Sequence, residues 1–150
     1  MTLATTYGLK QNMYSSRIQH VVTMDALFSH LPWTKAYNSF GFFFEDMAVR
    51  DLRVYAEALD GQLYHYRDSN GLECDTVLHR RNGSYALLEV KLGGEDYINE
   101  GAANMLKLAA SIDTDKMPAP TFMAVIIGVG KYAYRREDGV YVIPIGCLKD

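Results

Sequence analysis

The sequence predicts an α/β fold of the α+β class, in which helices flank one mixed sheet. A segment with helical periodicity comes first and is followed by three short strand-like segments separated by turns. A second helical segment then separates these strands from a buried apolar strand and a C-terminal hairpin. Because a strand meander followed by a helical crossover gives both antiparallel and parallel neighbours, we expect a mixed sheet with helices packed on it.

The first regular element is a helix, predicted over residues 41–58. Its apolar positions recur at steps of three and four residues, which places them on one helical face. The Asp60-Gly61 pair is a turn signal that ends the helix. The apolar face consists of Phe44, Ala48, Leu52 and Tyr55.

Three strands are predicted next, over residues 62–67, 73–79 and 85–92, with turn-forming residues between them. The third strand is the most continuously apolar, which is typical of a central strand. The second strand alternates, and its two predicted faces are Cys74, Thr76 and Leu78 on one side and Asp75, Val77 and His79 on the other.

The C-terminal half begins with a second helix, predicted over residues 95–112. A buried strand over residues 122–128 follows, and residues 132–136 and 140–145 form the two strands of a terminal hairpin. The apolar face of this helix consists of Ile98, Ala102, Met105, Leu106 and Ala109.

Residues 1–37 are predicted to be an irregular or partly helical lead-in, and residues 38–150 form the expected domain. A loosely helical pattern over residues 13–31 is ended by Pro32. A truncated linker is one interpretation of this lead-in.

The bulk composition narrows the class of protein. A chain of 150 residues, of which 49% are hydrophobic and 22% charged, indicates one globular domain with a real core. The net charge of −3 counts mildly against a dedicated nucleic-acid binder, which is usually basic. Cys74 and Cys147 lie far apart, and no secretory signal or membrane-spanning run is visible, so we expect reduced thiols, a cytoplasmic location and no membrane partner.

The most informative feature is Asp75 together with the Glu89-Val90-Lys91 triplet. On adjacent antiparallel strands joined by a tight turn, Asp75 and Glu89 lie at comparable distances from that turn, so their side chains can converge. Glu89 and Lys91 are two residues apart and share a face. Glu45, on the preceding helix, could add a third acid.

This grouping suits divalent-metal chemistry. Two carboxylates can hold Mg²⁺ or Mn²⁺ and leave coordination positions for water and a phosphate oxygen. A Glu-x-Lys triplet on a strand is more commonly a solvated surface pair. Here it follows an apolar stretch, where an ionised side chain costs free energy unless it is paired or bound to metal. We therefore predict a metal site formed by Asp75 and Glu89.

Other motifs give weaker predictions. The Gly128-Val129-Gly130-Lys131 segment lacks the first glycine and the final Ser or Thr of a phosphate-binding loop. The histidines lack metal-ligand spacing, and His65 is expected to be a strand residue, with a place in a substrate groove as the alternative. The basic pairs at Arg80 and Arg135 are expected to be solvated, with phosphate contact as the alternative.

Six blocks of the sequence form a recognisable series: residues 41–45 (GFFFE), 66–68 (YRD), 73–75 (ECD), 88–91 (LEVK), 100–108 and 134–150. In this order they resemble the C-terminal domain of a family of predicted prokaryotic ATPases of the AAA+ type. That domain is similar to the PD-(D/E)xK nuclease superfamily, which implies a restriction-endonuclease-like core. The resemblance also implies Glu45, Asp75, Glu89 and Lys91 as catalytic residues, with Asp75 and Glu89 on the metal.

The ATPase module of that family has no counterpart in this chain, so no ATP site is expected. The chain is then a truncated product, an excised domain or a free-standing relative. Two functions follow from the resemblance. One is a Mg²⁺-dependent nuclease acting on DNA phosphodiesters. The other is a non-catalytic accessory module that keeps the nuclease fold and binds an ATPase domain or a second copy of itself.

Overall fold

The computed structural model describes the backbone of residues 2–5, 20–23 and 33–148, and the side chains of residues 40–148. The chain divides into two units, residues 1–40 and residues 41–150. In the first unit, strand β1 (Thr2–Thr5) pairs in parallel with strand β2 (His20–Thr23). The helical pattern expected over residues 13–31 is therefore wrong at residues 20–23, and the rest of that segment lies outside the described residues.

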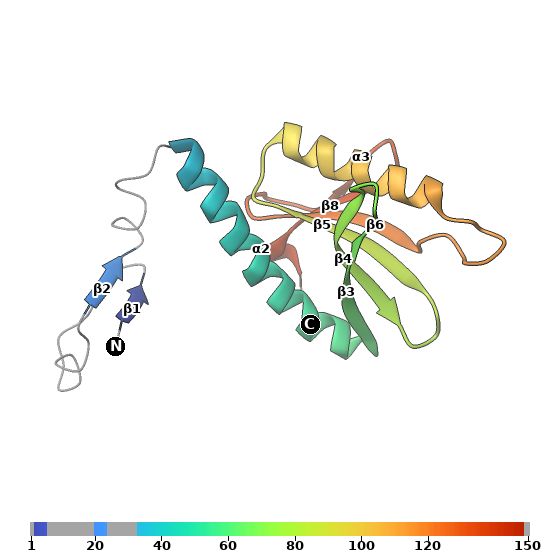
Figure 1. Cartoon of the computed structure of the whole chain (residues 1–150), viewed down its shortest axis with the longest axis horizontal. Coiled ribbons are helices and arrows are strands. Elements are labelled where there is room, and N and C mark those ends of the chain that lie inside the picture. Colours follow the sequence, from blue (N-terminus) through green and yellow to red (C-terminus); the bar gives the residue numbers. More distant parts are fainter. Residues whose placement is uncertain (1, 6–19, 24–32, 149–150) are drawn as a thin grey trace. The chain divides into compact units, whose positions relative to one another are not determined.

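The second unit contains the predicted order of helix, three strands, helix, strand and hairpin (Figure 1). This order confirms the α+β class. The elements are α2 (Trp33–Ala58, which starts in the first unit), β3 (Gly61–Arg67), β4 (Glu73–Arg80), β5 (Tyr85–Lys91), α3 (Glu95–Ser111), β6 (Phe122–Ile127), β7 (Tyr134–Arg135), β8 (Tyr141–Pro144) and a short 3₁₀ turn (Ile145–Cys147).

Helix α2 begins earlier than predicted. The expected start at Gly41 is wrong, because the helix runs from Trp33, directly after Pro32. Glycine lowers helix stability by only about 1 kcal/mol relative to alanine, which does not end a helix whose flanking residues support it. Proline, in contrast, disfavours helical continuation through its missing N–H and is well placed just before a first turn.

The sheet has six strands in the order β3-β4-β5-β6-β8-β7. Strands β3, β4 and β5 are antiparallel, whereas β5, β6 and β8 run parallel. Strand β7 closes the far edge by antiparallel pairing with β8. The mixed sheet predicted from the helical crossover is thus observed.

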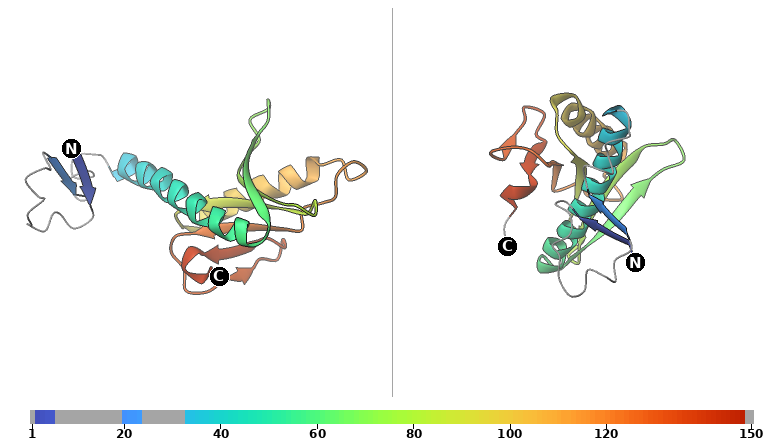
Figure 2. Two further views of the ribbon diagram at one scale, coloured as in Figure 1. Left: turned by 90° about the horizontal axis from the view of Figure 1, so that it is seen from below. Right: turned by 90° about the vertical axis from the view of Figure 1, so that its left-hand side faces the viewer.

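Two apolar clusters, one with residues of α2 and the other with residues of α3, cover opposite faces of the sheet. Figure 2 shows these helices and the sheet in two further views. Strand β5 contributes to both: Tyr85 and Leu87 pack with α3, whereas Ala86, Leu88 and Val90 pack with α2. A strand buried on both faces is central, as its continuous apolar sequence predicts. In the described ranges, no helix combines the length and apolarity needed to cross a membrane.

A β-bulge interrupts the pairing of β3 with β4. Tyr64 pairs with Val77 and Tyr66 pairs with Cys74, so one β3 residue, His65, opposes two residues of β4, Asp75 and Thr76. The extra residue breaks the period of two. Cys74 consequently packs in the cluster beneath α3, whereas Leu78 packs beneath α2, and the prediction that Cys74 and Leu78 share a face is wrong.

Candidate functional site

Three of the four predicted site residues come together at adjacent ends of β4 and β5. The Lys91 Nζ atom lies 2.8 Å from Glu89 Oε2 and 3.4 Å from Asp75 Oδ2. Lys91 therefore bridges the two carboxylates. The side chains of Asp75, Glu89 and Lys91 are 12%, 3% and 23% exposed, so this is a largely buried charged cluster rather than a solvated surface pair.

The position of Asp75 follows from the end of the strand ladder. The last register partners of β4 and β5 are Thr76 and Leu88. Beyond this point the Asp75 carboxylate replaces a backbone acceptor, because the Val90 N–H donates a hydrogen bond of 2.8 Å to Asp75 Oδ2. The bulge at Asp75 and Thr76 lies at the same place. Bulges commonly re-aim a side chain at the end of a paired segment, as this one does.

Glu89 and Lys91 are covered by α3 at Gly101. A Cβ atom at position 101 would lie 3.3 Å from Glu89 Cβ and 3.4 Å from Lys91 Cε. These are tight contacts, so a glycine here lets the helix backbone approach the two side chains closely. The sequence pattern identified the apolar face of this helix but not the role of Gly101.

Burial and charge together shift the ionisation of the cluster. Burial and the nearby Asp75 carboxylate raise the pKa of Glu89 to about 7, although Lys91 opposes this change. Burial alone would lower the pKa of Lys91. The two neighbouring carboxylates have the larger effect, so the pKa of Lys91 is raised. Lys91 therefore stays protonated, and a fully ionised cluster carries one excess negative charge.

The donor set fits a divalent cation in charge and in chemistry. Two carboxylates with an excess negative charge can be balanced by Mg²⁺ or Mn²⁺, which prefer oxygen ligands. In the described part of the chain, no group of three or more His, Cys, Asp or Glu side chains is arranged to hold a metal ion. A cation at this place would thus be held by Asp75 and Glu89, in competition with the Lys91 ammonium group.

Glu45 lies on α2 and is separate from the bridged cluster. Burial raises the pKa of Glu45, Asp75 raises it further, and Lys91 lowers it, so Glu45 is within electrostatic range of both residues. None of the described hydrogen bonds or ion pairs joins Glu45 to Asp75, Glu89 or Lys91. The structure therefore brings three of the four candidates into contact and leaves the fourth nearby.

His65 belongs to the surroundings of the cluster and was not identified as such from the sequence. Its Nδ1 atom lies 3.4 Å from the Asp75 carbonyl oxygen, and its Nε2 atom lies 3.3 Å from Glu73 Oε1. Both partners are acceptors, and which ring nitrogen donates depends on the tautomer of the imidazole. Only the bulge, which has no clear local sequence signal, brings His65 opposite Asp75.

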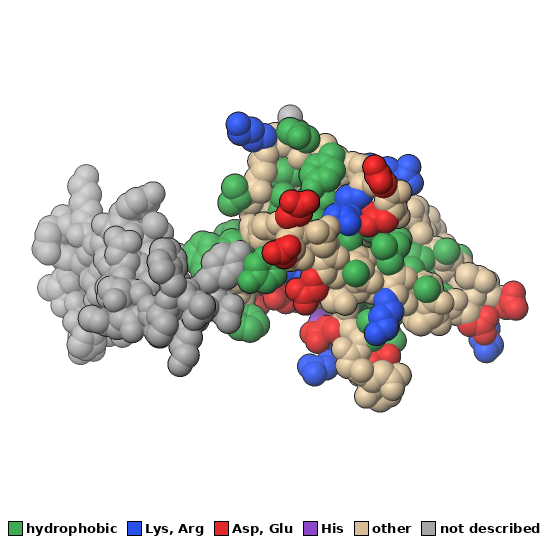
Figure 3. Space-filling view, turned by 90° about the horizontal axis from the view of Figure 1, so that it is seen from above, with side chains coloured by type: hydrophobic (Ala, Val, Ile, Leu, Met, Phe, Trp, Pro, Cys, Tyr) green, Lys and Arg blue, Asp and Glu red, His purple; other side chains and the backbone are tan. Residues whose placement is uncertain are grey.

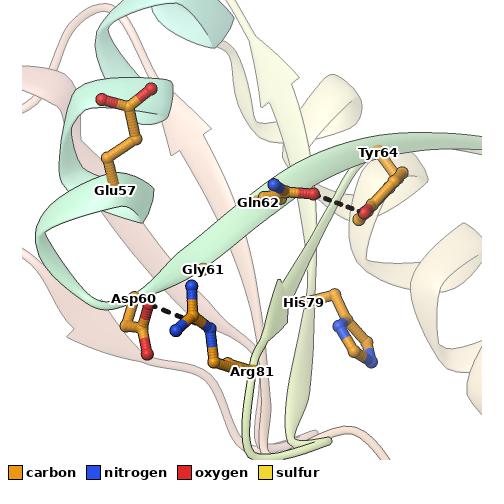
Figure 4. A pocket seen from close by; sticks show the side chains of 7 residues that line it. All are labelled: Glu57, Asp60, Gly61, Gln62, Tyr64, His79 and Arg81. Carbon is orange, nitrogen blue, oxygen red and sulfur yellow. Dashed lines mark hydrogen bonds and ion pairs between the residues drawn. The ribbon is translucent and has the colours of Figure 1, made fainter.

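A cavity of about 390 Å³ lies near the other end of β4 (Figure 4). It contains none of the four predicted site residues. Four of its polar side chains form two pairs: Arg81 contacts Asp60 at 3.4 Å, and the Tyr64 hydroxyl donates to Gln62 at 2.7 Å. The cavity is lined by Glu57, Asp60, Gly61, Gln62, Tyr64, His79 and Arg81.

Comparison with known families identifies one match, which covers most of the chain. Residues 40–148 match the model of a domain of unknown function, DUF4143. The chain belongs to the DUF4143 family. No curated protein and no solved structure gave a significant match. The matched range of this DUF4143 chain includes all four predicted site residues.

Proposed function

We propose that this DUF4143 domain is a Mg²⁺-dependent nuclease that acts on DNA phosphodiesters. The observation that carries the proposal is the buried cluster of Asp75, Glu89 and Lys91, which carries one excess negative charge when all three groups are ionised. The resemblance to the PD-(D/E)xK superfamily and to the C-terminal domains of AAA+-type ATPases supports the same assignment. A buried acidic pair is costly unless a cation or a proton compensates it.

Each residue has a distinct role in this proposal. Asp75 and Glu89 hold the cation, and the cation, when bound, lowers the pKa of a water molecule and stabilises negative charge on a phosphate. Lys91, released from one carboxylate, orients the water or donates to a phosphate oxygen. Glu45, whose pKa is raised, can hold or accept a proton close to Asp75.

Metal-dependent cleavage by the purified chain tests the proposal. Plasmid, linear and branched DNA are incubated with a Mg²⁺ or Mn²⁺ series, and Lys91→Ala is compared with wild type. We expect cleavage that requires metal and falls at least about a hundredfold in Lys91→Ala. Asp60→Ala, which changes a carboxylate of the remote cavity, is the matched control and should cleave like wild type. Wild-type protein that leaves all three substrates intact at every metal concentration would refute the proposal.

A second candidate function is a non-catalytic accessory module, and a specific surface favours it. Helix α2 exposes Phe42, Phe43, Met47 and Val54, with Phe42 70% and Val54 67% exposed. Exposed apolar side chains on one helix are typical of a protein–protein contact, here with an ATPase domain or a second copy. Calorimetry separates the two functions, because Mg²⁺ or Mn²⁺ binding that is lost in Asp75→Ala counts against a purely structural role.

A further inference from the structure

We propose that the outer edge of β3 is a dimer interface, at which β3 of a second copy of this chain pairs antiparallel with it and extends the sheet. The proposal goes beyond the nuclease function and does not depend on it. Strand β3 has seven residues and forms one edge of the sheet, whereas β7 at the other edge has two. Natural sheets protect long edge strands with proline, lysine or a bulge in the edge strand. Strand β3 contains neither residue, and the bulge beside it lies in β4.

The hydrogen bonds at both ends of β3 show which of its backbone groups point away from the sheet. The Arg81 N–H donates to the Asp60 carbonyl before the strand, and the Asp68 N–H donates to the Leu72 carbonyl after it. Because directions alternate along a strand, the even-numbered residues between these bonds face β4. The outward N–H and C=O groups are those of Gly61, Leu63, His65 and Arg67. No strand in the described part of the chain lies beyond them, and another extended backbone is the partner that matches their spacing.

The outward groups of β3 are complementary to those of an identical strand. With a two-fold axis at Tyr64, Gly61 of each copy faces Arg67 of the other, and Leu63 faces His65. Each outward N–H and C=O then meets an outward group of the second copy along the whole strand. A shifted register that keeps outward groups opposite one another leaves an end of each strand unpaired. The same surface therefore serves both copies, as a closed two-fold dimer requires.

Tyrosines meet at the centre of this interface, on the face of the sheet that carries α3. Tyr64 shares that face with its register partner Val77, which packs against the cluster beneath α3. The Tyr64 side chain is 53% exposed, donates a hydrogen bond of 2.7 Å to Gln62 and has an edge-to-face contact with His79. In the paired strands Tyr64 lies opposite its own copy at a non-hydrogen-bonded position, where side chains are closest. Aromatic cross-strand pairs of this kind stabilise a sheet.

On the other face, Arg67 of each copy lies opposite a position without a side chain. An added Cβ at Gly61 would lie 3.3 Å from the Ala56 carbonyl oxygen, so Gly61 adjoins the C-terminal turn of α2. That end of a helix carries partial negative charge, and the last turn of α2 contains no basic side chain. Arg67 is exposed, and its contact with Glu73 is 3.8 Å long. The guanidinium of one copy therefore approaches the negative end of a helix in the other.

A carboxylate that forms no ion pair lies beside Gly61. Glu57 and Asp60 both line the cavity at this end of β3, together with Arg81 (Figure 4). Arg81 pairs with Asp60, whereas Glu57 forms no ion pair with another described residue. Arg67 of a second copy supplies a cation for Glu57. An extended segment of an unrelated protein offers the same backbone groups but no cation at this place, so the interface favours a second copy.

The overall charge of the chain does not select a different class of partner. Figure 3 shows acidic and basic side chains next to one another, without a continuous surface of one sign on that face. The net charge of −3 opposes dimer formation only weakly, because separated charges are screened beyond about 8 Å at physiological salt. Local pairing of Arg67 with Glu57 therefore decides the partner.

Charge reversals test the interface, with dimer dissociation constants measured by analytical ultracentrifugation of the full chain in EDTA. Arg67→Glu and Glu57→Lys each place like charges at both symmetric contacts, so each variant alone should dimerise at least about tenfold more weakly than wild type. An equimolar mixture of the two should recover the wild-type affinity, because each contact then joins a cation to a carboxylate. Lys107→Glu reverses an exposed charge on α3 and should dimerise like wild type. Circular dichroism checks that all three variants are folded.

Disulfide cross-linking tests the register. In a Cys147→Ser background, which removes the exposed native thiol, Tyr64→Cys places two thiols opposite each other across the two-fold axis. Non-hydrogen-bonded partners have Cα atoms about 4.5 Å apart, within the range that a disulfide spans, so oxidation of the two thiols should yield a covalent dimer. The thiol of Tyr66→Cys lies opposite Gln62 rather than its own copy, so that variant should cross-link only together with Gln62→Cys.

Several results overturn the proposal. They are a wild-type chain that stays monomeric up to about 1 mM, charge reversals that leave the dissociation constant unchanged, a mixture that does not recover it, and cross-linking through Tyr66→Cys alone. A wild-type dimer that survives both reversals is held by another surface. Because EDTA removes divalent metal, none of these measurements depends on cleavage, and a failure of the nuclease proposal leaves them unaffected.

Discussion

At the scale of single residues, Glu89 is the carboxylate for which ionisation is most costly, because its side chain is buried and its charge is only partly compensated. Its side chain is 3% exposed, and the only cation in contact with it, among the described residues, is Lys91, which also contacts Asp75. One lysine cannot neutralise two carboxylates. Protonation of Glu89 or binding of a cation resolves the conflict, and both lead to measurable consequences.

The first consequence is a pH-dependent stability of the metal-free protein. The pKa of Glu89 is raised from 4.5 to about 7, so the folded state binds a proton more tightly than the unfolded state. This contribution to the free energy of unfolding is complete below about pH 4.5 and is lost as pH rises through about 7. Its size is on the order of 3 kcal/mol.

Urea unfolding in EDTA between pH 5 and pH 8 measures this contribution. We expect the wild-type free energy of unfolding to fall across the range and Glu89→Gln to show a flatter profile. Because the other titratable groups are common to both proteins, the difference between the profiles isolates Glu89. Parallel profiles would contradict the prediction.

A positioning role for His65 is the second prediction at this scale. His65→Ala should increase hydrogen exchange at the Val90 amide, because the Asp75 carboxylate that accepts from it is less well held. The side-chain amide nitrogen of Asn lies near the position of the His65 Nδ1 atom, so His65→Asn should keep the Val90 amide protected from exchange. The longer Gln side chain does not place its amide nitrogen there, so His65→Gln should not keep this protection.

The control for His65 is His79→Ala, which removes an exposed histidine at the other end of β4. Hydrogen-exchange rates of the Val90 amide, measured by NMR in the four variants without a metal ion, test the positioning role of His65. Equal rates in His65→Ala and His79→Ala would remove the positioning role.

At the scale of elements, α3 lies so close to β5 at Gly101 that a side chain there would require neighbouring atoms to move. A Cβ atom added at Gly101 would lie only 3.3 Å from Glu89 Cβ and 3.4 Å from Lys91 Cε, whereas Gly41 in α2 has nothing within 4 Å of an added Cβ. The two helical glycines therefore have the same intrinsic propensity but different surroundings. Their comparison separates helix propensity from packing.

Alanine substitutions at these glycines should differ. Gly41→Ala should stabilise the protein by up to about 1 kcal/mol, since alanine is the better helix former. Gly101→Ala gains the same propensity but loses about 1 kcal/mol or more to overpacking against Glu89 and Lys91. Urea unfolding at one pH gives both values, and equal stabilisation by the two substitutions would show that α3 shifts freely.

At the scale of the whole molecule, the apolar clusters are contained in the second unit. Every buried residue of both clusters lies between residues 44 and 142. A domain of residues 38–150 was predicted from sequence, and the matched family range is 40–148. The predicted division at residue 37 remains to be tested directly.

Deletion of residues 1–32 provides that test and preserves the whole of α2. We expect the shortened chain to unfold cooperatively, because both apolar clusters remain intact. Circular dichroism during thermal unfolding measures this, with the full chain as reference. Loss of a cooperative transition would show that the first unit is needed for folding.

Within residues 41–150, the sequence by itself determined the elements and their order. Apolar periodicity and turn residues act over a few positions, so β4, β5 and α3 were predicted within one or two residues of their observed ends. The pairing of Asp75 with the Glu89-Val90-Lys91 triplet also followed from distance to a shared turn. These features depend on neighbours along the chain.

Only the tertiary structure decided how those residues meet. The bulge opposite His65, the bond from the Val90 amide to Asp75 and the cover of Gly101 over Glu89 and Lys91 all arise between segments distant in sequence. Strand register and burial are set by packing of the whole sheet against its helices. Spacing therefore placed two carboxylates and a lysine together, but packing made them one buried cluster and left Glu45 apart.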